Sequence, residues 1–233
     1  MCGRYTNTAT ASELERRLNL DHVPERATGR YNVAPGQHVL AVVSDGDGRR
    51  AELLRWGLVP SWAKDPKIGY RMINARSETV TEKRSYRPLV DSSTHRALIV
   101  ADGFYEWLAP EDRKAPKTPI RFTLATGQTF MFAALWTTWR SPQGDVLPSA
   151  TILTTTPNPV VAPVHDRMPV MLADADAQAA WLDPSLDASL AVQLLRPLPS
   201  FLMKAAPASP LVNSARNDGP ELLDGPAEIE QAA

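Results

Sequence analysis

The chain has 233 residues, of which 43% are hydrophobic and 22% charged, and its formal net charge at pH 7 is −1. This is an ordinary composition for a soluble globular protein, and the length suits one sizeable domain or two small ones. No run approaches the roughly 18 apolar residues of a membrane span, and the N-terminus lacks the apolar core of a secretory signal. We therefore expect a cytoplasmic protein with no membrane partner.

The predicted elements are short and separated by turns, in keeping with 21 scattered prolines. A helix begins after the capping box that Thr10 and Glu13 would form, with Leu14 and Leu18 on one face. Short runs that are β-branched or aromatic and bounded by Gly, Pro or Asp predict strands at residues 40–43, 53–58, 97–101, 120–124, 129–135 and 150–155. Two later helices are predicted at residues 173–182 and 188–195.

This order of elements predicts an α+β fold, mainly an antiparallel β barrel-like or sandwiched sheet with a few peripheral helices. We expect a single domain over residues 2–223. The acidic tail at residues 224–233 is predicted to be disordered.

Cys2 is the only cysteine of the chain and directly follows Met1. Removal of Met1 would give a free α-amine and a thiol on neighbouring carbons, with reference pKa values of about 7.7–8.0 and 8.5. Such a 1,2-aminothiol attacks an aldehyde through nitrogen and closes through sulfur into a thiazolidine. The alternative is that a small second residue serves only to direct methionine removal. A single cysteine forms no internal disulfide and excludes zinc sites built from several cysteines, so no metal or cofactor is expected.

Three further segments carry functional side chains. Asn74 offers an amide that bonds a sugar or hemiaminal oxygen without titrating, and its alternative is a capped turn. Glu106 lies between two aromatics, a setting that raises a carboxyl pKa toward general-acid use, and its alternative is a surface salt bridge. His165 can shuttle protons near neutral pH or be structural, and Asp166 or Arg167 could fix the nearby structure.

A local basic stretch covers residues 63–96, where eight basic residues face four acidic ones. It indicates a bounded anionic partner, unless it is only a solvated charged face. The chain has no glycine-rich phosphate loop, no Gly-x-Ser-x-Gly and no His-Glu-x-x-His, which argues against nucleotide hydrolysis, serine esterase and zincin chemistry.

Taken together, these segments resemble the SOS response-associated peptidase (SRAP) family. The resemblance covers nearly the whole chain. It is carried by MCGRY (1–5), RYNVAPG (30–36), WGLVPSW (56–62), INARSET (73–79), ADGFYEW (101–107), HDRMPV (165–170) and VNSARNDGPEL (212–222).

The resemblance implies an abasic-site processing enzyme that binds single-stranded DNA and shields the lesion during the SOS response to DNA damage. Cys2 would form a covalent thiazolidine crosslink with the ring-opened sugar, and Asn74 would orient the amine or the sugar oxygen. Glu106 would move the proton that opens the sugar, and His165 would assist proton transfer. It implies a monomer associated with the nucleoid, with possible abasic-site lyase and autoproteolytic activity.

The DNA-binding residues implied in the same way are Arg4, Arg76 and Arg84, on the phosphates flanking the lesion, and Trp62. The family places two tryptophans in the segment that begins with WG-x-x-P, and here Ser61 stands where one aromatic is expected. Absence of that stacking platform would cost roughly 1–3 kcal/mol of base stacking.

Two other interpretations stay open. Cys2 could be the nucleophile of a thiol peptidase with His165 as its base, as the family's name suggests. The protein could instead be a non-catalytic reader of modified DNA. The basic stretch beside Asn74 suits DNA better than a peptide groove, and a reader has no need of an aminothiol.

Overall fold

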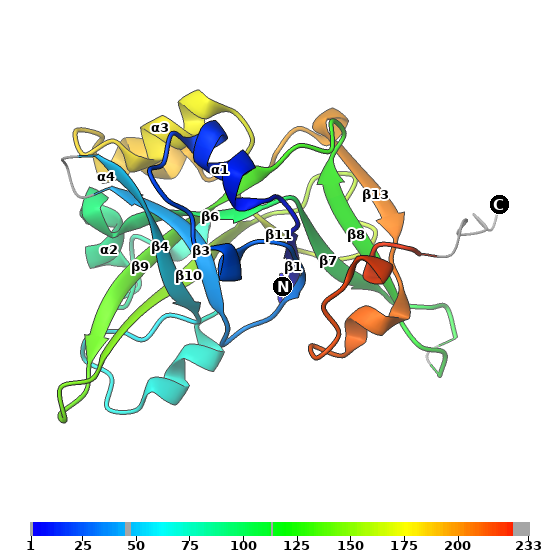
Figure 1. Ribbon diagram of the computed structural model, residues 1–233, viewed down its shortest axis with the longest axis horizontal. Helices are drawn as coiled ribbons and strands as arrows, with labels where there is room; N and C mark the ends of the chain where they lie inside the picture. Colours follow the sequence, from blue (N-terminus) through cyan, green and yellow to red (C-terminus); the bar gives the residue numbers. More distant parts are fainter. Residues whose placement is uncertain (1, 45–47, 113, 226–233) are drawn as a thin grey trace.

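The structure is a computed structural model that describes residues 2–44, 48–112 and 114–225. It has two β layers, a barrel on the left of Figure 1 and an open sheet on the right, and strand β1 of the open sheet contacts the barrel. The tail predicted at residues 224–233 lies outside the described residues from position 226 onward.

The barrel is a closed ring of five strands. The ring runs β10–β4–β3–β6–β9 and closes because β9 also pairs with β10. All of these pairings are antiparallel except β10 with β4, which is parallel. The strands are β3 (His38–Ser44), β4 (Arg49–Trp56), β6 (Arg96–Ala101), β9 (Phe130–Arg140) and β10 (Val146–Thr155).

Three short strands extend the barrel at its edges. β5 (Asn74–Arg76) pairs in parallel with β10 just beyond the end of β4, so that Asn74 lies opposite Ile152. β11 (Met168–Pro169) pairs with β10, and β12 (Met171–Leu172) pairs with β9. Strand β10 therefore carries both β5 and β11 beside it.

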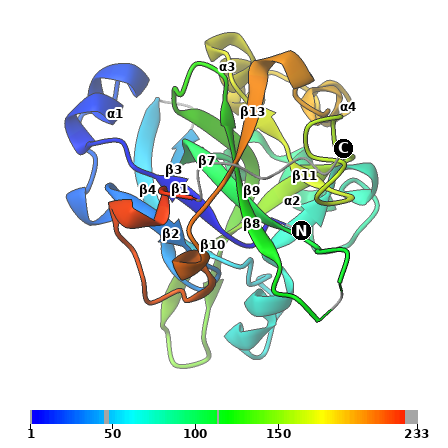
Figure 2. The same cartoon turned by 90° about the vertical axis from the view of Figure 1, so that its right-hand side faces the viewer.

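The second sheet is antiparallel throughout and has the order β13–β8–β7–β1–β2, which Figure 2 shows nearly face on. Its strands are β1 (Tyr5–Asn7), β2 (Arg30–Val33), β7 (Gly103–Leu108), β8 (Thr118–Leu124) and β13 (Met203–Pro207). The pairing of Tyr5 with Phe104 sets β1 directly beside β7. The strand that follows Cys2 and the strand that carries Glu106 are therefore neighbours.

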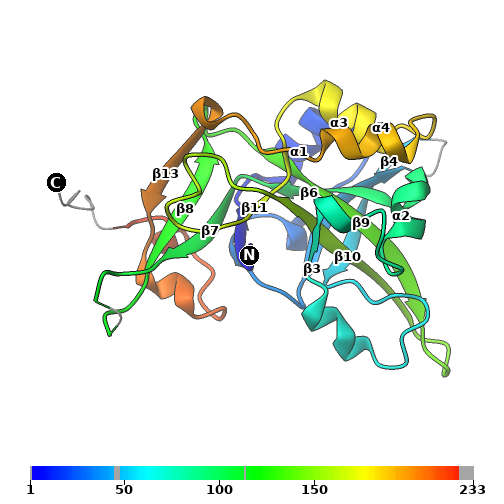
Figure 3. The same cartoon turned by 180° about the vertical axis from the view of Figure 1, so that it is seen from behind.

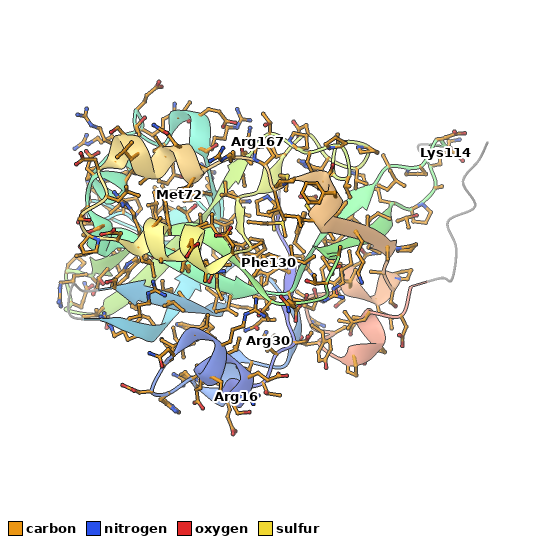
Figure 4. All side chains as sticks on the ribbon, turned by 90° about the horizontal axis from the view of Figure 1, so that it is seen from above. Arg16, Arg30, Met72, Lys114, Phe130 and Arg167 are labelled. Carbon is orange, nitrogen blue, oxygen red and sulfur yellow. The ribbon has the colours of Figure 1, made fainter. Side chains whose placement is uncertain are left out.

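The main core lies between the barrel interior and the open sheet. Tyr5 packs edge-on against Trp56 and Phe132, with ring centroids 5.4 and 5.6 Å apart. Phe130, labelled near the middle of Figure 4, belongs to the same buried cluster as Cys2. Because Cys2 and Tyr5 are buried, the N-terminal segment is anchored in the core.

Helices cover the outer face of the barrel, as the view from behind in Figure 3 shows. Trp181 anchors one of them by donating its indole N–H to the carbonyl of Ala97 over 3.0 Å. The helices are α1 (Ala11–Leu18), α2 (Arg87–Asp91), α3 (Ala175–Leu182) and α4 (Ala188–Ala191). None of the helices in the described part of the chain is long and apolar enough to span a membrane.

The α+β fold with a mainly antiparallel barrel is confirmed, and each of the six predicted strands is present. The strand predicted at residues 53–58 ends at Trp56, because Gly57 adopts a φ of 123° that breaks the extended run. The capping box of Thr10 with Glu13 also forms as predicted. The helix predicted at residues 188–195 is shorter, with one α-helical turn followed by a 3₁₀ turn at Val192–Leu194.

Candidate active site

Cys2 lies just before β1 and is fully buried in the core between the two layers. Its thiol faces the carbonyl oxygen of Arg4, with Sγ and O 3.9 Å apart. Burial raises the pKa of this thiol well above its ordinary value, and the negative charge of Glu106 raises it further. At neutral pH the sulfur is therefore held as a thiol rather than a thiolate.

Asn74 connects the chain start to the barrel. The parallel pairing of β5 with β10 fixes its backbone, and its Nδ2 donates to the carbonyl oxygen of Cys2 over 2.7 Å. Its Oδ1 is buried and accepts no hydrogen bond within the described part of the chain. A buried acceptor without a donor is costly, so this atom is suited to receive an N–H or O–H from a bound group.

Glu106 is supplied by β7 and is only 4% exposed. Burial raises the pKa of its carboxyl, while the nearby charge of His165 acts in the opposite direction. Glu106 thus acts on the thiol of Cys2, and His165 acts on Glu106, so the three side chains lie near one another. A carboxyl with a raised pKa keeps its proton to a higher pH than an ordinary one, which suits it to general acid–base catalysis.

His165 lies in the connection from β10 to β11, with its side chain 25% exposed. The backbone N–H of Arg167 donates to its Nδ1 over 3.0 Å. In the neutral ring the proton therefore resides on Nε2. Nδ1 also lies 2.9 Å from Oδ1 of Asp166, which would accept from Nδ1 in the protonated ring.

An ion pair ties the His165 segment to the end of β5. The guanidinium of Arg167 donates to both carboxylate oxygens of Glu78 over 2.7 and 2.8 Å, and to the carbonyl of Thr154 over 2.7 Å. The side-chain hydrogen bonding from Arg167 is the main cause that lowers the pKa of Glu78. Because Glu78 follows β5 closely, the pair fixes Asn74 and His165 relative to one another.

A pocket of about 620 Å³ opens beside Asn74, and we call it the basic pocket. It brings together Arg76, Lys83 and Arg84 on a surface that also contains apolar patches. Its lining residues are Met72, Asn74, Ala75, Arg76, Thr79, Lys83, Arg84, Ser85 and Tyr86. Asn74 thus contacts Cys2 and lines the basic pocket at the same time.

A model of the SOS response associated peptidase (SRAP) family matches residues 1–215 of the chain. The chain is also 44% identical to abasic site processing protein YoqW of Bacillus subtilis, over 96% of this chain and 99% of that one. The chain belongs to the SRAP family.

More distant relatives extend the likeness. Abasic site processing protein YedK of Escherichia coli is 30% identical over 96% of this chain and 99% of its own. HMCES of Xenopus tropicalis, also named an abasic site processing protein, is 33% identical over 83% of this chain and 65% of its own. A crystal structure from Bacteroides thetaiotaomicron shares the fold with a TM-score of 0.85 at 22% identity, covering 97% of this chain and 100% of that one.

Two of the predicted DNA-binding residues of this SRAP protein lie outside the basic pocket. Arg4 donates through one guanidinium nitrogen to Oδ1 of Asn32 over 2.8 Å and to the carbonyl of Val212 over 2.7 Å, and it lies over the ring of Trp107. Its binding to phosphate stays a prediction. Trp62 is 52% exposed in the connection between β4 and β5, where a base could reach it.

Sequence reasoning missed two members of this arrangement. The sequence indicates Lys83 only as one cation of the basic stretch, and the structure sets it in the basic pocket. Glu78 lies 89 positions from Arg167, so no local pattern indicates the pair. In the described part of the chain, no cluster of three or more His, Cys, Asp or Glu side chains could hold a metal ion.

Proposed function

We propose that this SRAP protein captures abasic sites in single-stranded DNA through a covalent thiazolidine at Cys2, once Met1 has been removed. The observation that carries the proposal is the double role of Asn74. Its amide donates to the Cys2 carbonyl over 2.7 Å, and the same residue lines a pocket with three cationic side chains. A strand bound there would bring its sugar to the new N-terminus.

The chemistry follows from an aminothiol meeting an aldehyde. The α-amine of Cys2 adds to the aldehyde carbon of the ring-opened sugar, and loss of one water gives an imine. The thiol then adds to the imine carbon, forming the C–S bond, while the nitrogen takes up a proton. Holding both partners in place turns a bimolecular capture into an effectively unimolecular one.

The proton transfers fall to the buried acid and the imidazole. Glu106, whose pKa burial raises, would protonate the ring oxygen as the furanose opens and later accept the thiol proton. His165, with its neutral-state proton on Nε2, would protonate the departing hydroxyl on imine formation. Oδ1 of Asn74 would accept from the attacking amine or the sugar hydroxyl.

Arg76, Arg84 and Lys83 would hold the phosphates on either side of the lesion. Such contacts position a strand without selecting its sequence, which suits a protein that must accept a lesion in any context. The sulfur ring replaces the imine, so the closed adduct would shield the strand from cleavage during the response to DNA damage.

The peptidase interpretation has weaker physical support. A thiol peptidase needs a thiolate, which a lowered pKa would favour. Burial instead raises the pKa of the Cys2 thiol. In the capture of an aldehyde, the α-amine attacks first. The sulfur enters only in the later ring closure, for which the thiol form is enough.

The test is to mix the mature protein with single-stranded DNA that contains one abasic site and to look for a conjugate that survives denaturation. Mass spectrometry should find an added mass of the DNA less one water at Cys2. A matched strand with the aldehyde reduced to an alcohol serves as the control. A wild-type protein that forms no adduct, or a Cys2→Ser variant that forms an equally heat-stable one, would overturn the proposal, because serine gives at most an imine or a labile oxazolidine.

A further inference from the structure

Two sequence motifs contain none of the residues that carry the proposed capture chemistry. They are RYNVAPG (30–36) and VNSARNDGPEL (212–222), and we call the second the C-terminal strap. The structure joins them, because the carboxylate of Asp218 accepts from the backbone N–H groups of Tyr31 and Asn32 over 2.6 and 2.9 Å. The C-terminal strap is thereby tied to β2.

Asn32 is the centre of this contact. Its side chain is fully buried, and its Nδ2 donates to the carbonyl oxygens of Ser214 and Asn217 over 2.9 and 2.8 Å. A third carbonyl of the strap, that of Val212, lies 3.3 Å from the same nitrogen. Both N–H donors of the amide are therefore used on the strap, and its Oδ1 is left to accept from another element.

Arg4 is the donor to that oxygen. Its Nη1 donates to Oδ1 of Asn32 over 2.8 Å and to the carbonyl of Val212 over 2.7 Å, which uses both hydrogens of this nitrogen. The guanidinium also lies over the ring of Trp107, 5.9 Å from the ring centroid. The indole N–H of Trp107 in turn donates to Oδ1 of Asn213 over 2.6 Å. Asn32 and the strap thus hold one edge of the guanidinium and the ring beside it.

In the described part of the chain, the edge of Arg4 formed by Nε and Nη2 is left for a ligand. Nε is buried and donates to no acceptor among the described residues, which is costly for a charged donor. The parallel N–H groups on one edge of a planar guanidinium match two oxygens of a phosphate. Because Arg4 lies two positions from Cys2, a phosphate bound at this edge would lie close to the point of capture.

We propose that Asn32 is a positioning residue that holds this edge of Arg4 toward a phosphate beside the abasic sugar. The inference rests on the proposed function and concerns DNA binding rather than bond formation. Asn32 itself would not touch the strand, because its side chain is fully buried. Without its amide, the Arg4 side chain would take other rotamers, and ordering it again on binding would reduce the affinity.

The effect should be confined to binding, because the backbone near Cys2 is held separately. Tyr105 donates its N–H to the carbonyl oxygen of Arg4 over 2.9 Å. Asn74 donates to the carbonyl oxygen of Cys2 from the side of the barrel. Removal of the Asn32 amide should therefore loosen the Arg4 side chain and leave Cys2 in place.

The experiment is a double-mutant cycle of Asn32→Ala and Arg4→Ala. The readout is binding to a single strand that contains tetrahydrofuran, a lesion analogue without an aldehyde. Asn32→Ala should bind about 2- to 12-fold more weakly than the wild type, which corresponds to ordering one long side chain. In the Arg4→Ala background the same change should have no further effect, because the side chain that Asn32 orients is gone. Asn32→Ser, which keeps a donor for the strap but lacks the amide oxygen, is measured in parallel and should show the same coupling.

A second readout separates positioning from a general loss of structure. With abasic DNA at saturating concentration, Asn32→Ala should form the Cys2 adduct at the wild-type rate, and only the DNA concentration that gives the half-maximal rate should rise. Asn7→Ala is the matched control, since Asn7 is also buried, lies in β1 of the same sheet and donates to the carbonyl of Ala27 over 3.0 Å. It should bind as the wild type does.

Additive effects of Asn32→Ala and Arg4→Ala would overturn the inference, and so would unchanged binding of either variant or an equal weakening in Asn7→Ala. A lower saturating rate with an unchanged half-maximal concentration would also overturn it, because Asn32 would then act on Cys2. A wild-type protein that forms no adduct overturns the proposed function instead. The binding cycle needs no aldehyde, so its result is read independently of that outcome.

Discussion

The side-chain amide of Asn74 donates to the backbone carbonyl of Cys2 over 2.7 Å. This bond spans 72 positions of sequence and joins the first residue of β5 to the start of the chain. Because β5 pairs with β10 of the barrel, the barrel itself sets where Cys2 lies. The position of Cys2 is thereby set before any ligand binds.

Replacing Asn74 should separate positioning from binding. We expect Asn74→Ala to slow adduct formation by roughly tenfold, in line with the removal of one well-placed hydrogen bond. Asn74→Asp should be slower still, because its carboxylate would face the Cys2 carbonyl oxygen without a proton to donate to it. The initial rate of adduct formation gives the effect, and binding to strands with a tetrahydrofuran lesion should change little. An Asn74→Ala protein that reacts at the wild-type rate would remove the residue from the mechanism.

The raised pKa of Glu106 predicts a pH dependence of stability. Above the ordinary value of 4.5, the unfolded chain loses the Glu106 proton while the native protein still holds it. The native state then binds more protons, so the contribution of Glu106 to the free energy of unfolding falls as pH rises through that window. In urea unfolding, the free energy of unfolding of Glu106→Gln should decline less steeply above pH 4.5 than that of the wild type. Identical slopes would contradict this prediction.

Glu78 should act with the opposite sign. Arg167 lowers its pKa, so the stabilisation is present above the ordinary value of 4.5 and is lost as pH falls through the lower native pKa. Because the Glu78 side chain is 45% exposed, we expect Glu78→Gln to cost only about 1–2 kcal/mol at neutral pH. Arg167→Lys keeps the charge but not the fork, and a double-mutant cycle of the two isolates the pair. Additive effects would show that the two side chains are not coupled.

Sequence patterns predicted the barrel better than the sheet that holds the N-terminus. Apolar runs such as residues 97–101 and 150–155 are strands because they are buried on both faces. By contrast, β1 is only three residues long and contains the polar residues Thr6 and Asn7. Both can be buried because Thr6 donates to Asp102 and Asn7 donates to the carbonyl of Ala27. Such burial depends on partners far along the chain, which a local pattern does not contain.

The candidate site also has parts that sequence patterns indicate and parts that only the tertiary structure reveals. Residue chemistry indicated Cys2, Asn74, Glu106 and His165 one at a time, and the family resemblance joined them. The ion pair of Glu78 with Arg167 and the contact of Arg55 with Tyr70 are tertiary in origin. Both appear only when β5, β10 and the end of β4 have been brought together by barrel closure.

Charge reversal in the basic pocket tests whether its cations hold phosphates. We expect Arg76→Glu to weaken binding to all single strands alike, whatever their sequence. The slope of log K against log salt should become shallower by about 0.7 for each phosphate that the variant no longer neutralises. Arg49→Glu, an equal reversal at an exposed residue outside the basic pocket, is the control. A sequence-dependent weakening, or an equal weakening in Arg49→Glu, would contradict the assignment.

Removing only the sulfur should turn capture into strand cleavage. In a Cys2→Ala variant processed to a free N-terminal amine, the imine forms but has no thiol to close it. The proton on the carbon next to the imine is then acidic. Its loss drives β-elimination, in which the bond from the sugar to the 3′ phosphate oxygen breaks.

Gel analysis of abasic oligonucleotides should show cleaved strands with Cys2→Ala, a stable conjugate with the wild type, and neither with Cys2→Ala whose amine has been acetylated. Because the acetylated protein keeps the same pocket and the same cations, it separates amine chemistry from mere binding. Strands that stay intact after long incubation with the free-amine variant would show that the imine is not reached without the thiol.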